Sequence, residues 1–198
     1  AERPIEVTIP TRLSPIFKCR DYGDALTQHD IQDVYAFYGE STKRNTNDQI
    51  GMLGIGSKAA FAYGDNYVIN SFLDGKKHIY NAFIDPSQIG QISKIGEEDT
   101  DEENGIEIIV PVRNDDHTEF EEKAHVLFRH FPVKPTVKGA DSRKFEYENP
   151  NVIFSGDNWK WIEVKDKRSY RNSDGAIVVM GNIGYPVDEY ALNLSHED

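Results

Sequence analysis

Apolar and polar residues alternate along two short segments near the start of the chain. Residues 5–9 (IEVTI) and 16–20 (IFKCR) place apolar side chains at alternate positions, and a Pro-containing break separates them. Successive side chains of a strand point to opposite faces of a sheet, so a period of two is typical of strands with one buried face. The pattern predicts two strands.

The period changes to that of a helix over residues 28–38. Thr27 is a good N-cap residue, and the apolar residues that follow it recur at helical spacing. Residues 39–49 then combine Ser, Thr, Lys, Arg, Asn and Asp without any period. We expect a short helix and, after it, a polar loop.

Strand-like runs and turn signals alternate through the middle of the chain. We expect helical character over residues 57–63 and strands over residues 67–72, 78–84, 89–95 and 106–112. Asp74-Gly75 and Asn104-Gly105 are typical of turns between strands, because Gly adopts positive φ at little cost. The acidic run 97–103 predicts a solvated loop.

One further helix completes the predicted main body of the fold. Phe120, Ala124, Leu127 and Phe128 lie at helical spacing, and the run stops near Pro132. Because the strands come mostly as hairpins, we predict an α+β two-layer sandwich with a mixed or largely antiparallel sheet.

The character of the sequence changes near residue 135, after which Asp, Asn and Gly are scattered among short apolar runs. We therefore divide the chain into residues 1–135, the main domain, and residues 136–198, a small strand-rich extension. The extension is expected to hold strands over residues 152–154, 159–164 and 176–180. Trp159 and Trp161 lie two residues apart, which favours packing; a partner-binding patch is the alternative.

Composition narrows the function classes. Lys and Arg total 22 against 34 Asp and Glu, and the net charge of −12 repels nucleic acid and anionic membranes while favouring a basic protein partner. The only cysteine, Cys19, cannot form an intrachain disulfide, and we expect it to be an unreactive residue of a strand. The lack of disulfides indicates an intracellular setting. The six histidines lack metal-ligand spacing, and no run approaches the roughly 20 apolar residues of a transmembrane segment.

The most informative stretch is residues 51–58 (GMLGIGSK). Three glycines within six residues let backbone N–H groups approach an anion without interference from Cβ atoms, and Lys58 adds a positive charge. The order Ser57-Lys58 is the reverse of a P-loop, and the polar residues 45–49 exclude the buried strand that a dinucleotide-binding motif requires. A phosphate-binding loop is the hypothesis, and a flexible glycine connection is the alternative.

Residues 20–23 (RDYG), some thirty residues before the glycines, extend this hypothesis to a nucleotide. The carboxylate of Asp21 can accept the exocyclic amine of adenine, Gly23 leaves room for the base, and the polar loop can close over the phosphates. The arrangement resembles the Bergerat ATP-binding fold of the GHKL superfamily, whose boxes are D-x-G-x-G and G-x-x-G-x-G. Ala25 stands where the first box has its second glycine.

Four landmarks narrow the resemblance to one family. Residues 19–23 (CRDYG), 54–63 (GIGSKAAFAY), 105–112 (GIEIIVPV) and 184–188 (GYPVD) resemble, in order, landmarks of the rIIA lysis-inhibition proteins of large tailed bacteriophages. The resemblance implies an ATP- or ADP-binding protein in the cytoplasm of the infected bacterium, acting in lysis inhibition or in countering host exclusion. The alternative is a non-catalytic interaction protein with a vestigial pocket and an acidic surface for a phage or host factor.

The resemblance also implies which residues bind the nucleotide. Asp21 would accept the adenine amine and Gly23 would lie against the base. The expected nucleotide-binding residues are Asp21, Gly23, Gly51, Leu53, Gly54, Ile55, Gly56, Ser57 and Lys58, and Lys43 and Arg44 are candidate lid contacts to the γ-phosphate.

Whether the protein is a GHKL-type ATPase depends on residues that this sequence does not match. In the superfamily, a helix before the first strand carries a catalytic Glu and a Mg-binding Asn, whereas only four residues precede Ile5. Either the chain begins after that helix or the protein is a degenerate relative. We therefore expect the chain to bind nucleotide, and we assign no catalytic residues. Mg is expected to bind only if the missing helix is supplied. Self-association through N-terminal segments is also expected, as in superfamily members.

Overall fold

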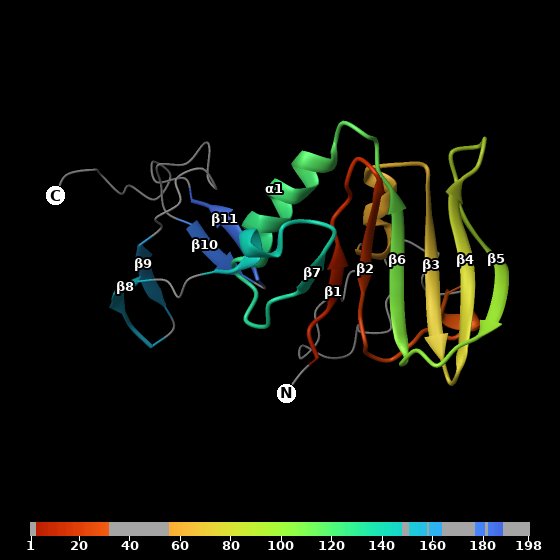
Figure 1. Cartoon of the computed structure of the whole chain (residues 1–198), viewed down its shortest axis with the longest axis horizontal. Helices are drawn as coiled ribbons and strands as arrows, with labels where there is room; N and C mark the ends of the chain where they lie inside the picture. The colour runs from red at the N-terminus through yellow and green to blue at the C-terminus, as the bar shows by residue number, and fades with distance from the viewer. Residues whose placement is uncertain are drawn as a thin grey trace.

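The computed structural model describes residues 3–31, 56–147, 151–157, 159–163, 177–180 and 182–187. Within that part of the chain, seven strands form one mixed sheet in the order β5-β4-β3-β6-β2-β1-β7 (Figure 1). The strands are β1 (Glu6–Thr8), β2 (Ile16–Arg20), β3 (Asn66–Leu73), β4 (Lys76–Ile84), β5 (Gly90–Asp99), β6 (Gly105–Pro111) and β7 (Thr136–Lys138). Neighbouring strands are antiparallel, except that β7 runs parallel to β1. The predicted α+β class with a mixed sheet is confirmed.

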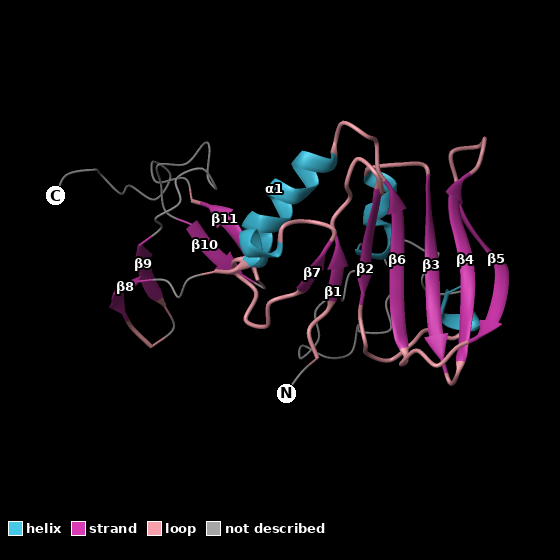
Figure 2. Cartoon of the chain, in the orientation of Figure 1, coloured by secondary structure: helices cyan, strands magenta, loops and turns pink. Residues whose placement is uncertain are grey.

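Helices make up a small share of the described residues (Figure 2). The α-helix α1 spans His117–Phe128, and the 3₁₀ helices η2 and η3 span Gly56–Ala62 and Ser142–Phe145. The helical character expected over residues 57–63 is confirmed, in its tighter 3₁₀ form.

A further helical turn occupies residues 28–31. Thr27 caps it, because its Oγ1 accepts a hydrogen bond of 3.2 Å from the backbone N–H of Asp30. The predicted N-cap is thus confirmed. The remainder of the helix predicted over residues 28–38, and the polar loop predicted over residues 39–49, lie outside the described residues.

One face of the sheet is buried, and the alternation of apolar residues selects that face. Val7, Cys19, Ile108, Ile69 and Tyr80 are successive cross-strand partners in a row that crosses β1, β2, β6, β3 and β4. Ile69 and Tyr80 are fully buried. Side chains two residues apart along a strand share a face, so the same apolar face continues above and below this row.

Helices cover this buried face through a chain of aromatic contacts. The ring of Phe120 in α1 lies 5.5 Å from that of Phe17 in β2 and 5.2 Å from that of Tyr63, just after η2. Within η2, Phe61 meets the ring of Tyr67 in β3 edge to face at 4.9 Å. Phe17 packs against both buried apolar clusters, so α1 and η2 cover the same face of the sheet.

The turn between β3 and β4 has the geometry expected of Asp74-Gly75. Asp74 has φ 51° and Gly75 has φ 79°, and two consecutive positive φ values are the signature of a type I′ hairpin turn. The backbone N–H of Asp74 also donates to Oδ1 of Asn104 at 3.0 Å. This bond joins the turn to the segment that leads into β6.

The prediction of a solvated loop over residues 97–103 is wrong for its first three residues, which belong to β5. Opposite charges on the neighbouring strand explain the difference, because cross-strand ion pairs stabilise a ladder that like charges would weaken. Nζ of Lys76 lies 2.6 Å from Asp99, and Nζ of Lys77 lies 2.8 Å from Glu98. Both lysines are on β4, so the acidic run continues the edge strand.

Two separate hairpins follow the main sheet. They are β8 (Asn151–Ser155) with β9 (Lys160–Glu163), and β10 (Ile177–Met180) with β11 (Ile183–Pro186). The strands predicted here are confirmed, and β11 was not predicted.

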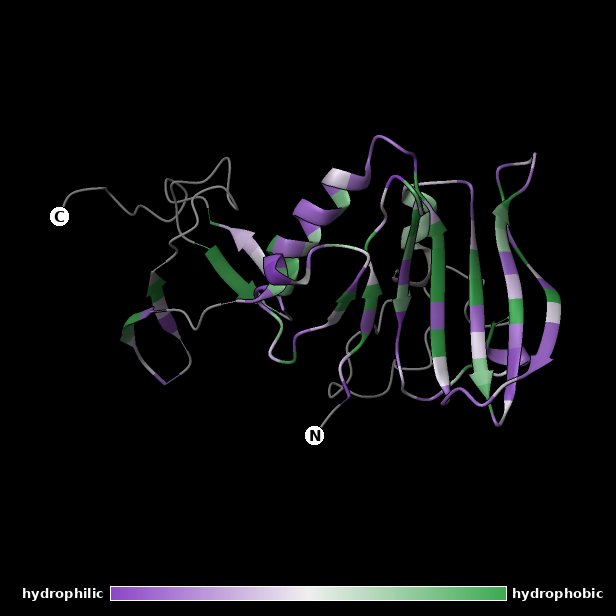
Figure 3. Cartoon of the chain, viewed as in Figure 1, coloured by the Kyte–Doolittle hydropathy of each residue, from purple (hydrophilic) through white to green (hydrophobic). Residues whose placement is uncertain are grey.

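The prediction that Trp159 and Trp161 pack against other residues is wrong within the described part of the chain, since their exposed fractions are 57% and 61%. Figure 3 shows hydrophobic residues along β8 and β10. The division of the chain into two parts at residue 135 stays a prediction. Strand β7 begins at the next residue, Thr136, and pairs with β1 of the main sheet.

Candidate functional site

Asp21 lies immediately after β2, where its side chain is held by the neighbouring strand. Its Oδ1 accepts hydrogen bonds from the backbone N–H groups of Ile106 at 3.0 Å and Gly23 at 3.2 Å. The backbone N–H of Asp21 donates to the carbonyl of Ile106 at 2.9 Å. Two donors on one oxygen fix the carboxylate, while Oδ2 has no hydrogen-bond partner within the described part of the chain. One acceptor oxygen is thus oriented and receives no hydrogen bond from the described residues.

Gly23 lies two residues further, at an exposed position. A Cβ atom added there would meet only Oδ1 of Asp21, at 3.9 Å, which is ordinary van der Waals contact. The described part of the fold therefore has room for a side chain at this position.

Gly105 is different, because the chain around it leaves no room for a side chain. Its φ is +139°, and an added Cβ would clash with the carbonyl oxygen of Asp21 and lie 2.5 Å from Nη1 of Arg20 and 2.9 Å from Oδ1 of Asp21. A glycine is required for β6 to begin this close to the carboxylate. Sequence reasoning missed Gly105 as a site residue, because it was interpreted as part of a turn and as the start of the landmark segment 105–112, and neither interpretation indicates contact with Asp21.

Arg20 holds the backbone on both sides of this close approach. Its side chain is 5% exposed. Nη1 donates to the carbonyl of Asp21 and Nη2 donates to the carbonyl of Glu103, both at 2.5 Å. The guanidinium therefore joins the end of β2 to the segment that enters β6.

Aromatic rings stack against this guanidinium. Cζ of Arg20 lies 3.9 Å from the centroid of the Phe72 ring and 4.7 Å from that of Tyr22. A second guanidinium, that of Arg3, lies 3.4 Å from the Tyr22 centroid and forms an ion pair with Glu103. Cation–π contacts gain strength where water is excluded, so the contacts of the buried Arg20 stabilise the turn that follows β2.

The chain that leaves the Asp21 turn is tied to the buried face. Oγ of Ser71, a fully buried residue of β3, accepts from the backbone N–H of Leu26 at 3.2 Å and donates to its carbonyl at 2.6 Å. Oδ2 of Asp30 then accepts from the backbone and hydroxyl of Thr27, and these bonds lower the pKa of Asp30. The bonds from Ser71 therefore hold the chain at Leu26, and those between Thr27 and Asp30 fix the start of the helical turn.

The predicted phosphate-binding residues are only partly within the described residues. Gly51, Leu53, Gly54 and Ile55, together with the candidate lid residues Lys43 and Arg44, lie outside them. Gly56, Ser57 and Lys58 form the first turn of the 3₁₀ helix η2. Their role toward phosphate stays a prediction.

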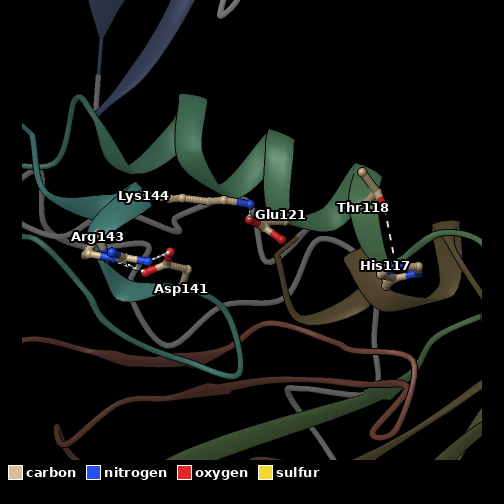
Figure 4. Close-up of polar contacts among 6 residues, drawn as sticks. All are labelled: His117, Thr118, Glu121, Asp141, Arg143 and Lys144. Carbon is tan, nitrogen blue, oxygen red and sulfur yellow. Dashed lines mark hydrogen bonds and ion pairs between the residues drawn. The ribbon is translucent and has the colours of Figure 1, made fainter.

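Polar contacts elsewhere on the surface have structural roles. Figure 4 shows Lys144 of η3 paired with Glu121 of α1, and Arg143 paired with Asp141. The backbone N–H of Arg143 also donates to Oδ1 of Asp141 at 3.1 Å, which caps η3. The exposed His117–Thr118 contact at the start of α1 is likewise local. Of these contacts, the Lys144–Glu121 pair attaches η3 to α1.

Neither a metal cluster nor a membrane-spanning helix occurs in the described ranges. No group of three or more His, Cys, Asp or Glu residues there could hold a metal ion. No helix among those residues is long and apolar enough to cross a membrane.

Cys19, two residues before Asp21, is expected to be a poor nucleophile in the folded protein. Burial, followed by the negative charge of Asp21, raises the pKa of the Cys19 thiol from 9.0 to about 11. At pH 8 the thiolate fraction should be about a hundredfold lower than that of an ordinary thiol. We expect slow reaction with Ellman's reagent in buffer and fast reaction in denaturing urea; equally fast reaction in both would contradict this environment.

Comparison with known proteins adds no relative. No family model matches the chain, and no curated protein matches it at a significant level. The GHKL and rIIA resemblance therefore rests on the sequence motifs quoted above and stays a prediction.

Proposed function

We propose that this protein binds ATP or ADP, with Asp21 accepting a hydrogen bond from the exocyclic amine of adenine. The observation that carries the proposal is the difference in hydrogen bonding between the two carboxylate oxygens of Asp21. Oδ1 is held by two backbone N–H groups, whereas Oδ2 has no partner among the described residues. A carboxylate fixed in this way selects a donor and disfavours a carbonyl oxygen at the same position of the base.

The openness at Gly23 supports the same function. The described part of the fold does not require a glycine there, since an added Cβ would meet only one of its atoms, at normal contact distance. A planar base lying against the turn would account for the missing side chain. Asp21 and Gly23 would then contact the edge and the face of one adenine.

The strand pairing supports the resemblance to the Bergerat fold. Two of the four landmark segments, residues 19–23 and 105–112, are distant in sequence yet adjacent in the sheet through the pairing of β2 with β6. Helices α1 and η2 cover one face of a mixed sheet, which suits a two-layer sandwich of GHKL type. The proposed setting is the rIIA-like one, in lysis inhibition or countering host exclusion in an infected bacterium. The proposal is limited to binding, because the superfamily's catalytic Glu and Mg-binding Asn are not matched in the sequence.

Titration calorimetry with ATP and ADP, with and without Mg, tests the proposal. We expect saturable heat at one nucleotide per chain in the absence of Mg, because the contacts proposed for Asp21 and Gly23 involve only the base. GTP serves as the control, since it carries a carbonyl oxygen where ATP carries the amine. A folded chain, verified by circular dichroism, that binds neither ATP nor ADP would contradict nucleotide binding.

The second candidate is an interaction protein with a vestigial pocket. Exposed apolar side chains on the C-terminal hairpins favour it: Phe154 and Trp161 on β8–β9, and Met180 on β10. Large exposed apolar side chains mark protein-binding surfaces in many proteins, and the net charge of −12 favours a basic partner. The two candidates differ at Asp21, because an interaction protein would function in infection without its carboxylate.

A further inference from the structure

We propose that Arg20 and Gly105 form a positioning pair that sets the orientation of the Asp21 carboxylate, and through it the selectivity for adenine. The inference rests on the proposed nucleotide-binding function. Neither residue needs to touch the base. Each acts on the carboxylate through the backbone around it.

Gly105 permits the close approach of the two strands. With a side chain at this position, the carbonyl of Asp21 and the guanidinium of Arg20 could not both stay where they are. One of the two N–H groups that orient Oδ1 belongs to Ile106, the residue after Gly105. A displacement at Gly105 would therefore move one of the two donors that fix the carboxylate.

Arg20 keeps the end of β2 and the segment before β6 close together. Its two hydrogen bonds go to the carbonyl of Asp21 and to that of Glu103, which lies two residues before Gly105. Both partners are neutral carbonyl groups, although the side chain is almost fully buried. Its cross-strand partners Glu6 and Glu107 interact instead with Lys138 and Asn70, and among the described residues no carboxylate forms an ion pair with Arg20. Burying a charge without an ion pair is costly, and an apolar side chain of similar length could cover Phe72 at less cost. Only a planar guanidinium can donate hydrogen bonds to both carbonyl groups at once in this geometry.

Nearby Lys18 offers a matched control. Lys18 lies on the same strand and the same face of the sheet as Arg20, two residues earlier, and carries the same charge. Arg20→Met and Lys18→Met each remove one positive charge from this face. Only the first removes the bridge between Asp21 and Glu103.

The experiment has two readouts on the whole chain. The first is hydrogen exchange of the Ile106 N–H, which reports its bond to the carboxylate without any nucleotide. The second is the ratio of the affinities for ATP and ITP, which carries a carbonyl oxygen in place of the adenine amine. We expect Arg20→Met to speed the exchange and to lower the ATP preference, each by about tenfold, and Lys18→Met to change neither by more than about twofold.

Arg20→Lys keeps the charge and guards against a variant that fails to fold. An ammonium is a point donor on a flexible stem and cannot reproduce the fork, so we expect values between those of the wild type and Arg20→Met.

The outcomes separate the positioning pair from the proposed function. If the wild type binds neither nucleotide while Arg20→Met and Arg20→Lys speed exchange at Ile106, nucleotide binding fails and the positioning of the carboxylate stands. If the Arg20 variants leave exchange at Ile106 unchanged, the positioning pair is overturned. If exchange rises but the ATP preference is kept, Arg20 has a merely structural role and the link to selectivity is overturned.

Discussion

Replacing Asp21 by Asn is expected to abolish the preference for ATP and to lower its affinity by about a hundredfold or more, since a site built for one hydrogen bond rejects the mismatched group strongly. The N–H groups of Ile106 and Gly23 both require an acceptor at the Oδ1 position. The Asn carbonyl oxygen satisfies them, so its NH₂ group takes the place of Oδ2. That NH₂ then faces the adenine amine, and two donors repel.

The same geometry predicts a change of preference rather than a simple loss. An NH₂ group in the Oδ2 position matches the carbonyl oxygen of inosine, so Asp21→Asn should bind ITP better than ATP. Calorimetry with both nucleotides measures the ratio. Asp24→Asn is the matched control, because Asp24 is an exposed carboxylate three residues away and its loss makes the same change in charge. If Asp21→Asn binds ATP as the wild type does, Asp21 does not read the base.

Replacing Ile69 by Ala is expected to lower the free energy of unfolding by about 2–5 kcal/mol, the cost of deleting a buried Ile side chain and leaving a cavity. Ile69 is 0% exposed in β3, an interior strand of the sheet, where it pairs with Tyr80 on one side and Ile108 on the other. Urea unfolding followed by circular dichroism measures the loss, with an unchanged slope showing that the same surface unfolds.

Ile95→Ala is the control for this core position. Ile95 is the same residue type in β5 of the same sheet, but it is 62% exposed, so its replacement should stay within about 0.5 kcal/mol. If both variants lost the same free energy of unfolding, Ile69 would not lie on a buried face of the sheet.

Local chemistry allowed most of the strands to be predicted. The alternation in residues 16–20 and the positive φ demanded of Asp74-Gly75 depend only on neighbours in the chain. Asp21 and Gly23 could be named for the same reason, because a carboxylate and a glycine at the end of a predicted strand have a recognisable spacing. The geometry of that turn is consistent with the role proposed for both residues.

Contacts between distant segments could not be predicted in this way. Residues 97–99 are acidic and read as a loop, but the lysines of β4 that face them convert the run into a strand. Trp159 and Trp161 were expected to pack, yet packing depends on whether another element covers them, and the described residues leave both exposed. The sheet order and the parallel pairing of β7 with β1 likewise depend on the whole chain.

The sequence by itself determined the α+β class, the positions of most strands and turns, and Asp21 as the candidate base-binding residue, because periodicity, turn chemistry and residue type are local properties. Only the tertiary structure decided what surrounds that carboxylate. It placed Gly105 and Ile106 beside Asp21 and stretched Arg20 between two carbonyls some eighty residues apart in the chain. The physical reason is that a hydrogen bond depends on distance in space, and strand pairing brings those atoms together.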